Sequence, residues 1–211
     1  MTDSSDIARW AEVLRDVSAA GLFHSEIFYD RERYSRLQSL AEEMMAAAIG
    51  ITTEDFTPLQ KELFDHPGPL IGADAAIFDD RDRILLIRRS DNGLWAMPGG
   101  AAEVGERPAD AAVREALEES GVASRPVGLV GIYDNHLWGS NSSNHVYMLM
   151  FICEPTGGMA LETEPSHSLE ITERAWFALE DLPEDLDPRH RGRIPHAFEF
   201  REGIRPTYFD V

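Results

Sequence analysis

The sequence predicts an α/β fold with a mixed sheet and helices on both of its sides, preceded by a small helical N-terminal domain. Helical periodicity dominates the first 66 residues, and the run His66-Pro67-Gly68-Pro69 that follows cannot continue a helix. Beyond it, short β-branched runs and helical patterns intermix without the regular alternation of a doubly wound sheet. We therefore expect two domains, residues 1–66 and residues 67–211.

Length, charge and cysteine content limit the class of protein. A chain of 211 residues with 43% hydrophobic residues can form one full core and a small extra domain. Its 38 acidic and 19 basic residues give a formal charge of -19, which argues against binding to nucleic-acid backbones or anionic membranes. The single cysteine, Cys153, and the lack of a secretory signal or of an apolar run of about 18 residues predict a cytoplasmic protein.

Two amphipathic helices are expected in the N-terminal domain. The first covers about residues 5–20, with Ser4 or Ser5 as its N-cap and Gly21 at its end. The second covers about residues 30–49 and is followed by another glycine. Each helix carries one apolar stripe at helical spacing, formed by Ile7, Trp10, Ala11 and Leu14 on the first and by Tyr34, Leu37, Ala41, Met44 and Ala48 on the second.

Short helices of this kind form a thin core when they stand alone. A third, shorter amphipathic segment is expected at about residues 58–64. The apolar stripes are therefore expected to pack either on another subunit, which would make the protein a homodimer, or on the main domain.

The second domain begins with a hairpin. Its strands cover residues 73–78 and 83–89, on either side of the turn Asp79-Asp80-Arg81-Asp82. A short strand then leads into the glycine pair Gly99-Gly100. Further strand-like runs occupy residues 127–133, 145–154 and 174–177, and a polar loop covers residues 134–144.

A helix from Pro108 to Ser120 is the best-punctuated element of the chain, because proline suits the first helical position and the following Gly121 suits a left-handed C-cap. Its apolar face is expected to carry Ala109, Val113, Ala116 and Leu117. Three glutamates, Glu115, Glu118 and Glu119, recur at i, i+3 and i+4 on the opposite face, where like charges repel and the helix dipole disfavours anions. Arg114 is expected to offset only one of them.

This acidic face is either a solvated surface or a binding site for a divalent cation. Charge runs on helices are usually only solvated surface. However, the helix follows a strand and a glycine loop, and carboxylates beside backbone carbonyls suit hard divalent cations, which bind several oxygens and a phosphate substrate.

The residues from Gly100 to Val122 resemble the Nudix box. The match includes Gly100, Glu106, Arg114-Glu115, Leu117-Glu118-Glu119 and Gly121, with the box spacing kept throughout. Arg107 stands where a helix N-cap serine or threonine is expected, so capping is expected to fall to Glu106 or Asp110.

The resemblance implies a Nudix α/β/α sandwich and hydrolysis assisted by Mg²⁺, or by Mn²⁺ in its place. It makes Glu115 and Glu119 the principal metal ligands, with Glu118 sharing the metals or a bridging water and the Gly99 carbonyl as a backbone ligand. Arg114 is implied to hold a box carboxylate. In the family the general base comes from the box or from a later loop, where our first choice is Glu170, with Glu173 in reserve and Glu162 and Glu164 as further candidates.

The N-terminal residues resemble the small helical extension of one Nudix subgroup, most clearly in the run Tyr29-Asp30-Arg31-Glu32-Arg33-Tyr34. Arg31 and Arg33 could equally be surface ion pairs with Glu32 or Glu43. The subgroup implies a small-molecule substrate, a nucleoside diphosphate linked to another moiety, of the ADP-ribose or CDP-choline type. A Nudix hydrolase of nucleoside triphosphates and a non-enzymatic sensor that binds ADP-ribose are the alternatives.

Substrate contacts are expected around the glycine loop and in the polar loop. Arg88 and Trp95 flank the former, and His136 and Trp138 lie in the latter. Aromatic side chains could stack a base, since every base offers a π face. Most of them could instead belong to the core, although the polar surroundings of Trp138 argue against that for this residue. His136 and His145 could contact phosphate or be purely structural.

Overall fold

The computed structural model describes residues 3–56, 68–139, 145–157, 161 and 165–211, and the chain forms two compact units, Met1–Gly68 and Pro69–Val211. The expected amphipathic segment at 58–64 lies outside the described residues. Among the helices that are described, none is both long and apolar enough to cross a membrane.

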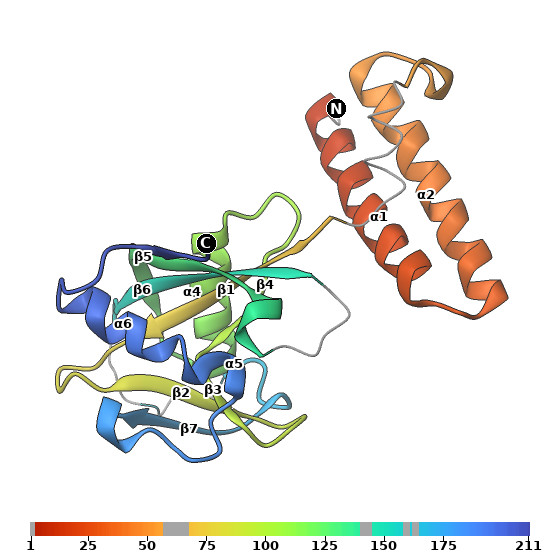
Figure 1. Cartoon of the computed structure of the whole chain (residues 1–211). Helices are drawn as coiled ribbons and strands as arrows, with labels where there is room; N and C mark the ends of the chain where they lie inside the picture. The colour runs from red at the N-terminus through yellow and green to blue at the C-terminus, as the bar shows by residue number, and fades with distance from the viewer. Residues whose placement is uncertain (1–2, 57–67, 140–144, 158–160, 162–164) are drawn as a thin grey trace. The chain divides into compact units, whose positions relative to one another are not determined.

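The first unit is a pair of antiparallel helices, α1 (Ser4–His24) and α2 (Phe28–Ile49), followed by the short 3-10 helix η1 (Thr53–Asp55) (Figure 1). Asp3 is the N-cap of α1, so the expectation of Ser4 or Ser5 at that position was wrong. The Asp3 backbone N–H donates to the Asp6 carboxylate at 3.4 Å, which satisfies a backbone donor at the helix start.

Gly21 lies inside α1, which corrects the expectation that the helix ends there. A Cβ atom at Gly21 would lie 2.4 Å from the ring of Tyr34 on α2. The glycine therefore allows the aromatic ring of one helix to pack against the backbone of the other. α2 ends as predicted, at Gly50, which has a left-handed φ of 76°.

The turn between the helices is held by Arg31, whose guanidinium donates to the carbonyl of Ser25 at 3.0 Å and to that of Leu22. Arg31 therefore closes the turn, and Arg33 forms an ion pair with Asp30 at 3.0 Å. The ion pairs that the sequence suggested, with Glu32 or Glu43, are not the ones that these two arginines form.

The second unit contains a five-stranded mixed sheet in the order β4-β1-β6-β5-β8. Its central strand pairs are parallel between β1 and β6 and antiparallel between β5 and β6, while β8 lies parallel to β5 at one edge. The strands are β1 (Leu70–Ile77), β4 (Gly99–Ala101), β5 (Ser124–Asp134), β6 (Val146–Pro155) and β8 (Tyr208–Phe209).

A second, antiparallel sheet has three strands in the order β3-β2-β7. These strands are β2 (Ile84–Arg89), β3 (Trp95–Ala96) and β7 (Ile171–Phe177). The hairpin predicted at its start is formed differently, because β1 enters the larger sheet and β2 enters the smaller one. The α/β class and the mixed sheet expected from the sequence are confirmed.

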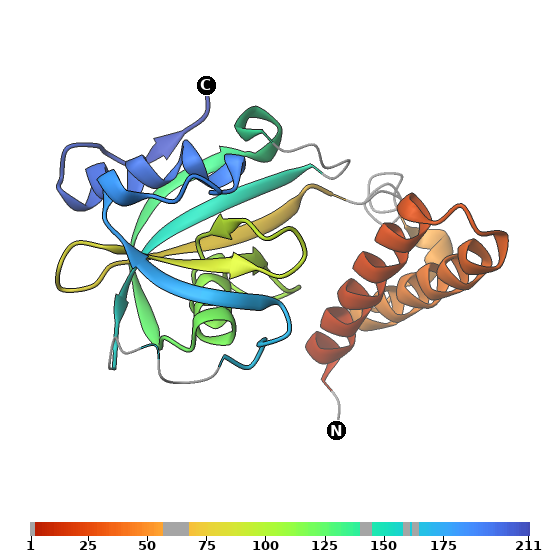
Figure 2. The ribbon, with the colours of Figure 1, turned by 90° about the horizontal axis from the view of Figure 1, so that it is seen from below.

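Helices lie on both sides of the larger sheet (Figure 2). α4 (Pro108–Ser120) packs on Ala73, Ala75 and Ile77 of β1, whereas Ala76 points into the other cluster, which includes α6 (Ile194–Arg201). Alternate residues of one strand thus serve two cores. The C-terminal helices α5 (Pro188–Arg191) and α6, and the 3-10 helices η2 (Asn135–Trp138) and η3 (Leu179–Asp181), were not predicted. Cys153 is buried in the cluster beneath α4.

Candidate active site

Two glycines of β4, predicted from the sequence to lie in a loop, bring the backbone before α4 into contact with the glutamates of that helix. The Gly99 N–H donates to Glu119 Oε2 at 2.8 Å. A Cβ atom at Gly99 would lie 2.6 Å from Asp74 Oδ1, and one at Gly100 would lie 2.5 Å from Glu115 Oε1. Because real Cβ atoms do not approach so closely, a side chain at either position would displace the carboxylates.

The helix α4 faces the core through small residues. Ala111, Ala112 and Ala116 are fully buried, whereas Leu117 is 48% exposed, so the expectation that Leu117 belongs to the apolar face was wrong. The buried face of α4 is thus turned about its axis relative to the expected one, and this affects the glutamates. Glu119 lies on the edge of the buried face and is only 6% exposed.

The ends of α4 follow the sequence at one end and depart from it at the other. Pro108 is the first helical residue, and Gly121, with φ of 73°, donates its N–H to the Leu117 carbonyl at 2.9 Å, as predicted. At the start, Arg107 is the N-cap and makes no side-chain capping bond. The Asp110 carboxylate accepts hydrogen bonds from the Arg107 side chain, and the Glu106 carboxylate accepts them from Arg114. Neither acid therefore caps the helix as the sequence suggested.

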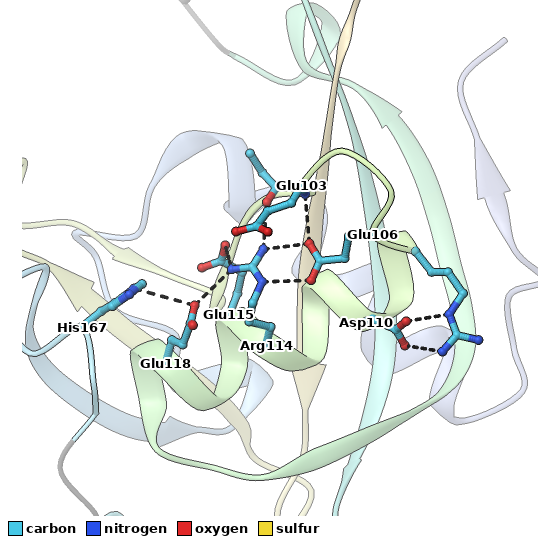
Figure 3. Close-up of polar contacts among 9 residues, drawn as sticks. Glu103, Glu106, Asp110, Arg114, Glu115, Glu118 and His167 are labelled. Atoms are coloured by element: carbon cyan, nitrogen blue, oxygen red, sulfur yellow. Dashed lines mark hydrogen bonds and ion pairs between the residues drawn. The ribbon is translucent and has the colours of Figure 1, made fainter. Parts of the chain in front are cut away.

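Arg114 holds several carboxylates at once (Figure 3). Its guanidinium donates to both Glu106 oxygens at 2.9 and 3.0 Å, to Glu115 Oε1 at 2.7 Å and to Glu118 Oε2 at 3.0 Å. The expectation that it offsets one glutamate of the patch therefore underestimated it. The hydrogen bonds to Glu106 do most to raise the pKa of Arg114, and they lower that of Glu106. Arg114 thereby orients two of the three glutamates that are candidate metal ligands, Glu115 and Glu118.

A cavity of about 440 Å³ lies beside the two glycines, Glu115 and Glu119. Its wall brings together the glycine loop, α4, the end of β2 and the loop before β7. The lining residues are Arg89, Ser90, Asp91, Gly99, Gly100, Glu115, Glu119, His167, Glu170 and Ile171. The cavity is therefore lined by Glu170, our first choice for the general base, together with three of the four candidate metal ligands, Gly99, Glu115 and Glu119.

Glu119 has a strongly perturbed pKa. Burial is the main cause and raises the pKa to about 8; the charges of Glu115 and Glu170 add to the rise, while the Gly99 N–H and Arg89 oppose it. A carboxylate that is costly to ionise among other carboxylates is what a cation would stabilise.

The donor set fits a divalent cation. Ligand atoms of Glu115, Glu118 and His167 lie within 4.8 Å of one another, and Glu119 faces the same cavity. Carboxylate oxygens of this number suit hard cations such as Mg²⁺. His167 was not predicted. Its N–H donates to the Glu118 carbonyl at 3.0 Å and its Nδ1 lies 3.9 Å from Glu118 Oε2. The one feature of the sequence that could have indicated His167 is its position three residues before Glu170.

Arg88 and Arg89 lie on opposite faces of β2, as neighbours in a strand do. Arg89 lines the cavity, and Arg88 turns away to bind Glu173 at 2.7 Å and Asp185 at 3.0 Å. The structure thus places the candidate substrate residue Arg88, and the reserve base Glu173, outside the cavity lining. Glu162 and Glu164 lie outside the described residues.

The expected aromatic contacts are part of the packing. Trp95 is 7% exposed and meets Phe177 edge to face. Trp138 packs edge-on against Tyr133 and Tyr208, so the idea that its polar loop keeps it out of the core was wrong. Neither tryptophan lines the cavity. His136, the fourth candidate for substrate contact, stacks on His145 instead of facing the cavity wall.

Buried charges support the glycine loop from behind. Asp74 and Arg193 form an ion pair of 2.7 Å with side chains 2% and 3% exposed. Nearby, His190 Nδ1 accepts the Met97 N–H at 3.3 Å, and burial lowers the pKa of His190 to about 4, so the ring is neutral at pH 7. Burial opposes the ionisation of Asp187, yet hydrogen bonds from Arg189 hold its pKa at about 2. None of these contacts was predicted.

The fold and the glutamate-bearing helix define the class of protein. Residues 68–197 match the model of the NUDIX domain, and the chain belongs to the Nudix family of pyrophosphohydrolases. Residues 5–59 match a second model, described as a UDP-X-like, N-terminal oligomerisation domain. Both resemblances stated from the sequence are thereby confirmed.

Relatives extend over the whole chain. A Bacillus subtilis protein named "Putative ADP-ribose pyrophosphatase YjhB" is 34% identical over 204 residues, which cover 95% of each chain. A solved structure titled as a UDP-X diphosphatase is 27% identical, covers 99% of this chain and 100% of its own, and has a TM-score of 0.61. The structure of an ADP-ribose pyrophosphatase from Streptococcus suis is 29% identical, covers 68% and 100%, and has a TM-score of 0.57.

Proposed function

We propose that the protein hydrolyses the P–O–P bridge of nucleoside diphosphates linked to another moiety, with the help of a divalent metal ion. Water adds to one phosphorus and the bridging oxygen leaves with the other, which yields a nucleoside monophosphate and a phosphorylated second product. The observation that carries this proposal is the convergence of Glu115, Glu119 and the glycine loop on one cavity. The names of the full-length relatives support the same substrate class.

We assign the metal to Glu115 and Glu119, with Glu118 and the Gly99 carbonyl as further ligands, and we name Mg²⁺ or Mn²⁺ as the ion. When bound, the ion would neutralise charge on the diphosphate and lower the pKa of a water. Arg114 keeps Glu115 and Glu118 in position through its hydrogen bonds. Arg89, which lines the cavity and forms an ion pair of 2.8 Å with Asp91, would supply a cation for the phosphates.

Within this class we propose substrates of the ADP-ribose or CDP-choline type and make no choice between them. The metal site and the glycine loop would treat both alike, because both carry a nucleoside diphosphate. The expected aromatic contacts give no basis for a choice, since Trp95 and Trp138 belong to the packing. The cytoplasmic location also remains a prediction.

A substrate screen tests the proposal. The wild-type protein is incubated with Mg²⁺ and one substrate at a time: ADP-ribose, CDP-choline, a UDP-sugar or a deoxynucleoside triphosphate. The nucleoside monophosphate that each reaction releases is quantified. We expect at least one conjugate to be turned over faster than any triphosphate. Faster turnover of triphosphates would contradict the substrate class, and tight binding of ADP-ribose without hydrolysis would indicate a sensor.

We further propose that Glu170 is the general base. It lines the cavity and its charge contributes to the raised pKa of Glu119. Glu170→Gln is expected to lower kcat about 100-fold with little change in KM, because a positioned base contributes roughly 10²–10⁴-fold. Glu173→Gln is the matched control, since Glu173 binds Arg88 outside the cavity. The opposite pattern, with kcat lost only in the Glu173 variant, would move the role to that residue.

We also propose that the helical unit forms a homodimer. Trp10, Val13 and Val17 leave an apolar stripe exposed along α1, with Val17 50% exposed, and the match to an oligomerisation domain supports association. Val17→Glu is expected to shift the dimer to monomer in sedimentation experiments at micromolar concentration. Ala47→Glu, a similar change at an exposed position of α2, is expected to leave the dimer intact. A monomeric wild type would remove the basis for this proposal.

A further inference from the structure

A second group of metal-ligand side chains lies outside the cavity wall. Asp134, at the end of β5, His136, in η2, and His145, just before β6, each offer one ligand atom, and these atoms lie within 4.8 Å of one another. His145 Nε2 is already 3.1 Å from Asp134 Oδ2, and the two imidazole rings stack with their centroids 4.9 Å apart. None of the three lines the candidate active site.

We propose that these three residues bind a transition-metal ion of the zinc class, separate from the metal of the hydrolytic site. Two imidazoles and one carboxylate are a donor set for Zn²⁺, Fe²⁺ or Co²⁺, whereas Mg²⁺ prefers oxygen ligands. Ligand atoms about 2.0–2.1 Å from a tetrahedral ion lie about 3.3 Å from each other. The Asp134–His145 pair has nearly that spacing, and the exposed His136 offers a third ligand atom within 4.8 Å of the other two.

The carboxylate of the group is held in place by its own backbone surroundings. Asp134 Oδ1 accepts the His136 N–H at 3.0 Å, which leaves Oδ2 directed at His145. The Asp134 N–H in turn donates to Asp210 Oδ2 at 2.6 Å, and Asp210 Oδ1 accepts the Trp138 indole N–H at 2.9 Å. Such a frame positions ligands before an ion arrives, which lowers the cost of binding.

The group is also open to solvent, which decides the kind of site. The side chains of Asp134 and His145 are 26% and 38% exposed, and His136 is exposed. Three protein ligands leave a fourth position for water or for an anionic group of a ligand, as in zinc sites that are not purely structural. An ion pair that merely fastened the turn would need Asp134 and His145 alone, so His136 distinguishes the two interpretations.

Metal binding by the full chain tests this proposal. Equilibrium dialysis with Zn²⁺ is carried out in an excess of Mg²⁺, which occupies the glutamates of the hydrolytic site. We expect one zinc ion per wild-type chain. His136→Ala and His145→Ala are each expected to weaken zinc binding by more than about tenfold, because even outer-shell partners of metal ligands contribute 10–100-fold.

Two control variants locate the site. His24→Ala removes an exposed histidine of α1, and His167→Ala removes the histidine near Glu118, so both are expected to bind zinc as the wild type does. His145→Gln keeps a donor for Asp134 while removing the imidazole, and thermal unfolding in a chelator checks that each variant is folded. Visible absorption of Co²⁺-loaded protein is expected to show four-coordinate rather than octahedral geometry.

Three outcomes would overturn the proposal. They are a wild type that keeps no zinc in excess Mg²⁺, zinc affinity unchanged in the His136 variant, and a loss that appears in the His167 variant alone. The last result would place the ion among Glu115, Glu118 and His167. None of these measurements depends on substrate hydrolysis, so they stand apart from a failure of the proposed activity.

Discussion

The two units of the chain differ in how they bury apolar side chains. The helical unit has a small buried cluster of Ala41, Ala46 and Phe56, and it exposes large side chains such as Phe23 and Phe28, which are 58% and 73% exposed. The hydrolase unit encloses two extensive clusters, one on each side of its larger sheet. One unit thus carries its own core, and the other has surface that a partner would cover.

The units differ in buried charge as well. In the hydrolase unit Asp74, Glu119, Asp187 and Arg193 are all buried. In the described part of the helical unit, Ser18 is the one buried polar residue. Buried charges are costly unless they are paired. Asp74 and Arg193 pair with each other, and Asp187 pairs with Arg189. Glu119 differs from them, because burial raises its pKa, so the cost of a buried charge falls mainly on this candidate metal ligand.

The largest expected effect comes from breaking the buried pair behind the glycine loop. Arg193→Met leaves Asp74 buried without its partner and is expected to lower the free energy of unfolding by about 3–5 kcal/mol. Arg36→Met in the helical unit is the matched control, because its ion pair with Glu32 is exposed and is expected to contribute less than about 0.5 kcal/mol. Urea unfolding measures both. Equal losses of unfolding free energy in the two variants would show that the units do not differ in how much their ion pairs contribute to stability.

Removal of a candidate metal ligand is the next largest effect. Glu119→Gln is expected to lower kcat at least about 100-fold, equivalent to about 2.7 kcal/mol, while the chain stays folded. In metal-free protein the variant is expected to be slightly more stable, because it removes a carboxylate that is costly to ionise. Glu202→Gln, at an exposed position, serves as the control. A folded variant with wild-type turnover would contradict the assignment of the metal site.

The pH dependence of stability gives a smaller effect with a definite sign. The folded-state pKa of Glu119, about 8, lies above its ordinary value of 4.5, so the stabilising proton is lost as the pH rises toward 8. His190, with a pKa of about 4, changes stability in the opposite direction, but only below its ordinary value of 6.5. Metal-free protein is therefore expected to lose about 1–2 kcal/mol between pH 6.5 and 8.

Denaturant unfolding at several pH values checks this expectation. Glu119→Gln is expected to flatten the profile in that window, and added Mg²⁺ is expected to restore stability at pH 8 in the wild type alone. A wild-type profile as flat as that of the variant would show that burial does not perturb Glu119. The helical unit offers an internal reference, because its shifted carboxylates, Asp3, Glu54 and Asp55, are all exposed and hydrogen bonds lower the pKa of each.

The sequence predicted those features that depend on neighbours along the chain. The glutamate spacing, the start at Pro108 and the left-handed Gly121 are all local, and all were found as expected. The direction in which α4 faces the core is not local. It depends on Ala111 and Ala112 fitting against β1, and this contact exposed Leu117 and buried Glu119. A pattern of apolar residues treats alanine as weaker than leucine and so selected the wrong edge of the helix.

Contacts between distant segments were also beyond reach of the sequence. Asp74 and Arg193 are separated by 119 residues, and His167 meets Glu118 only because the segment before β7 folds onto α4. Trp138 was misjudged because composition described its loop as polar, while its partly buried ring packs edge-on against Tyr133, His196 and Tyr208. The composition of a segment does not show which distant side chains will pack against it in the fold.

The carboxylate of Asp210 accepts hydrogen bonds from three places: the backbone of Asp134, the indole of Trp138 and the hydroxyl of Tyr208. One side chain therefore links the end of β5, the η2 turn and the edge strand β8. The indole N–H of Trp138, one of four tryptophans, gives a spectroscopic window on this junction. In NMR spectra its proton should shift and exchange faster with solvent whenever the edge strand detaches, so a single resonance would follow the opening of that side of the sheet.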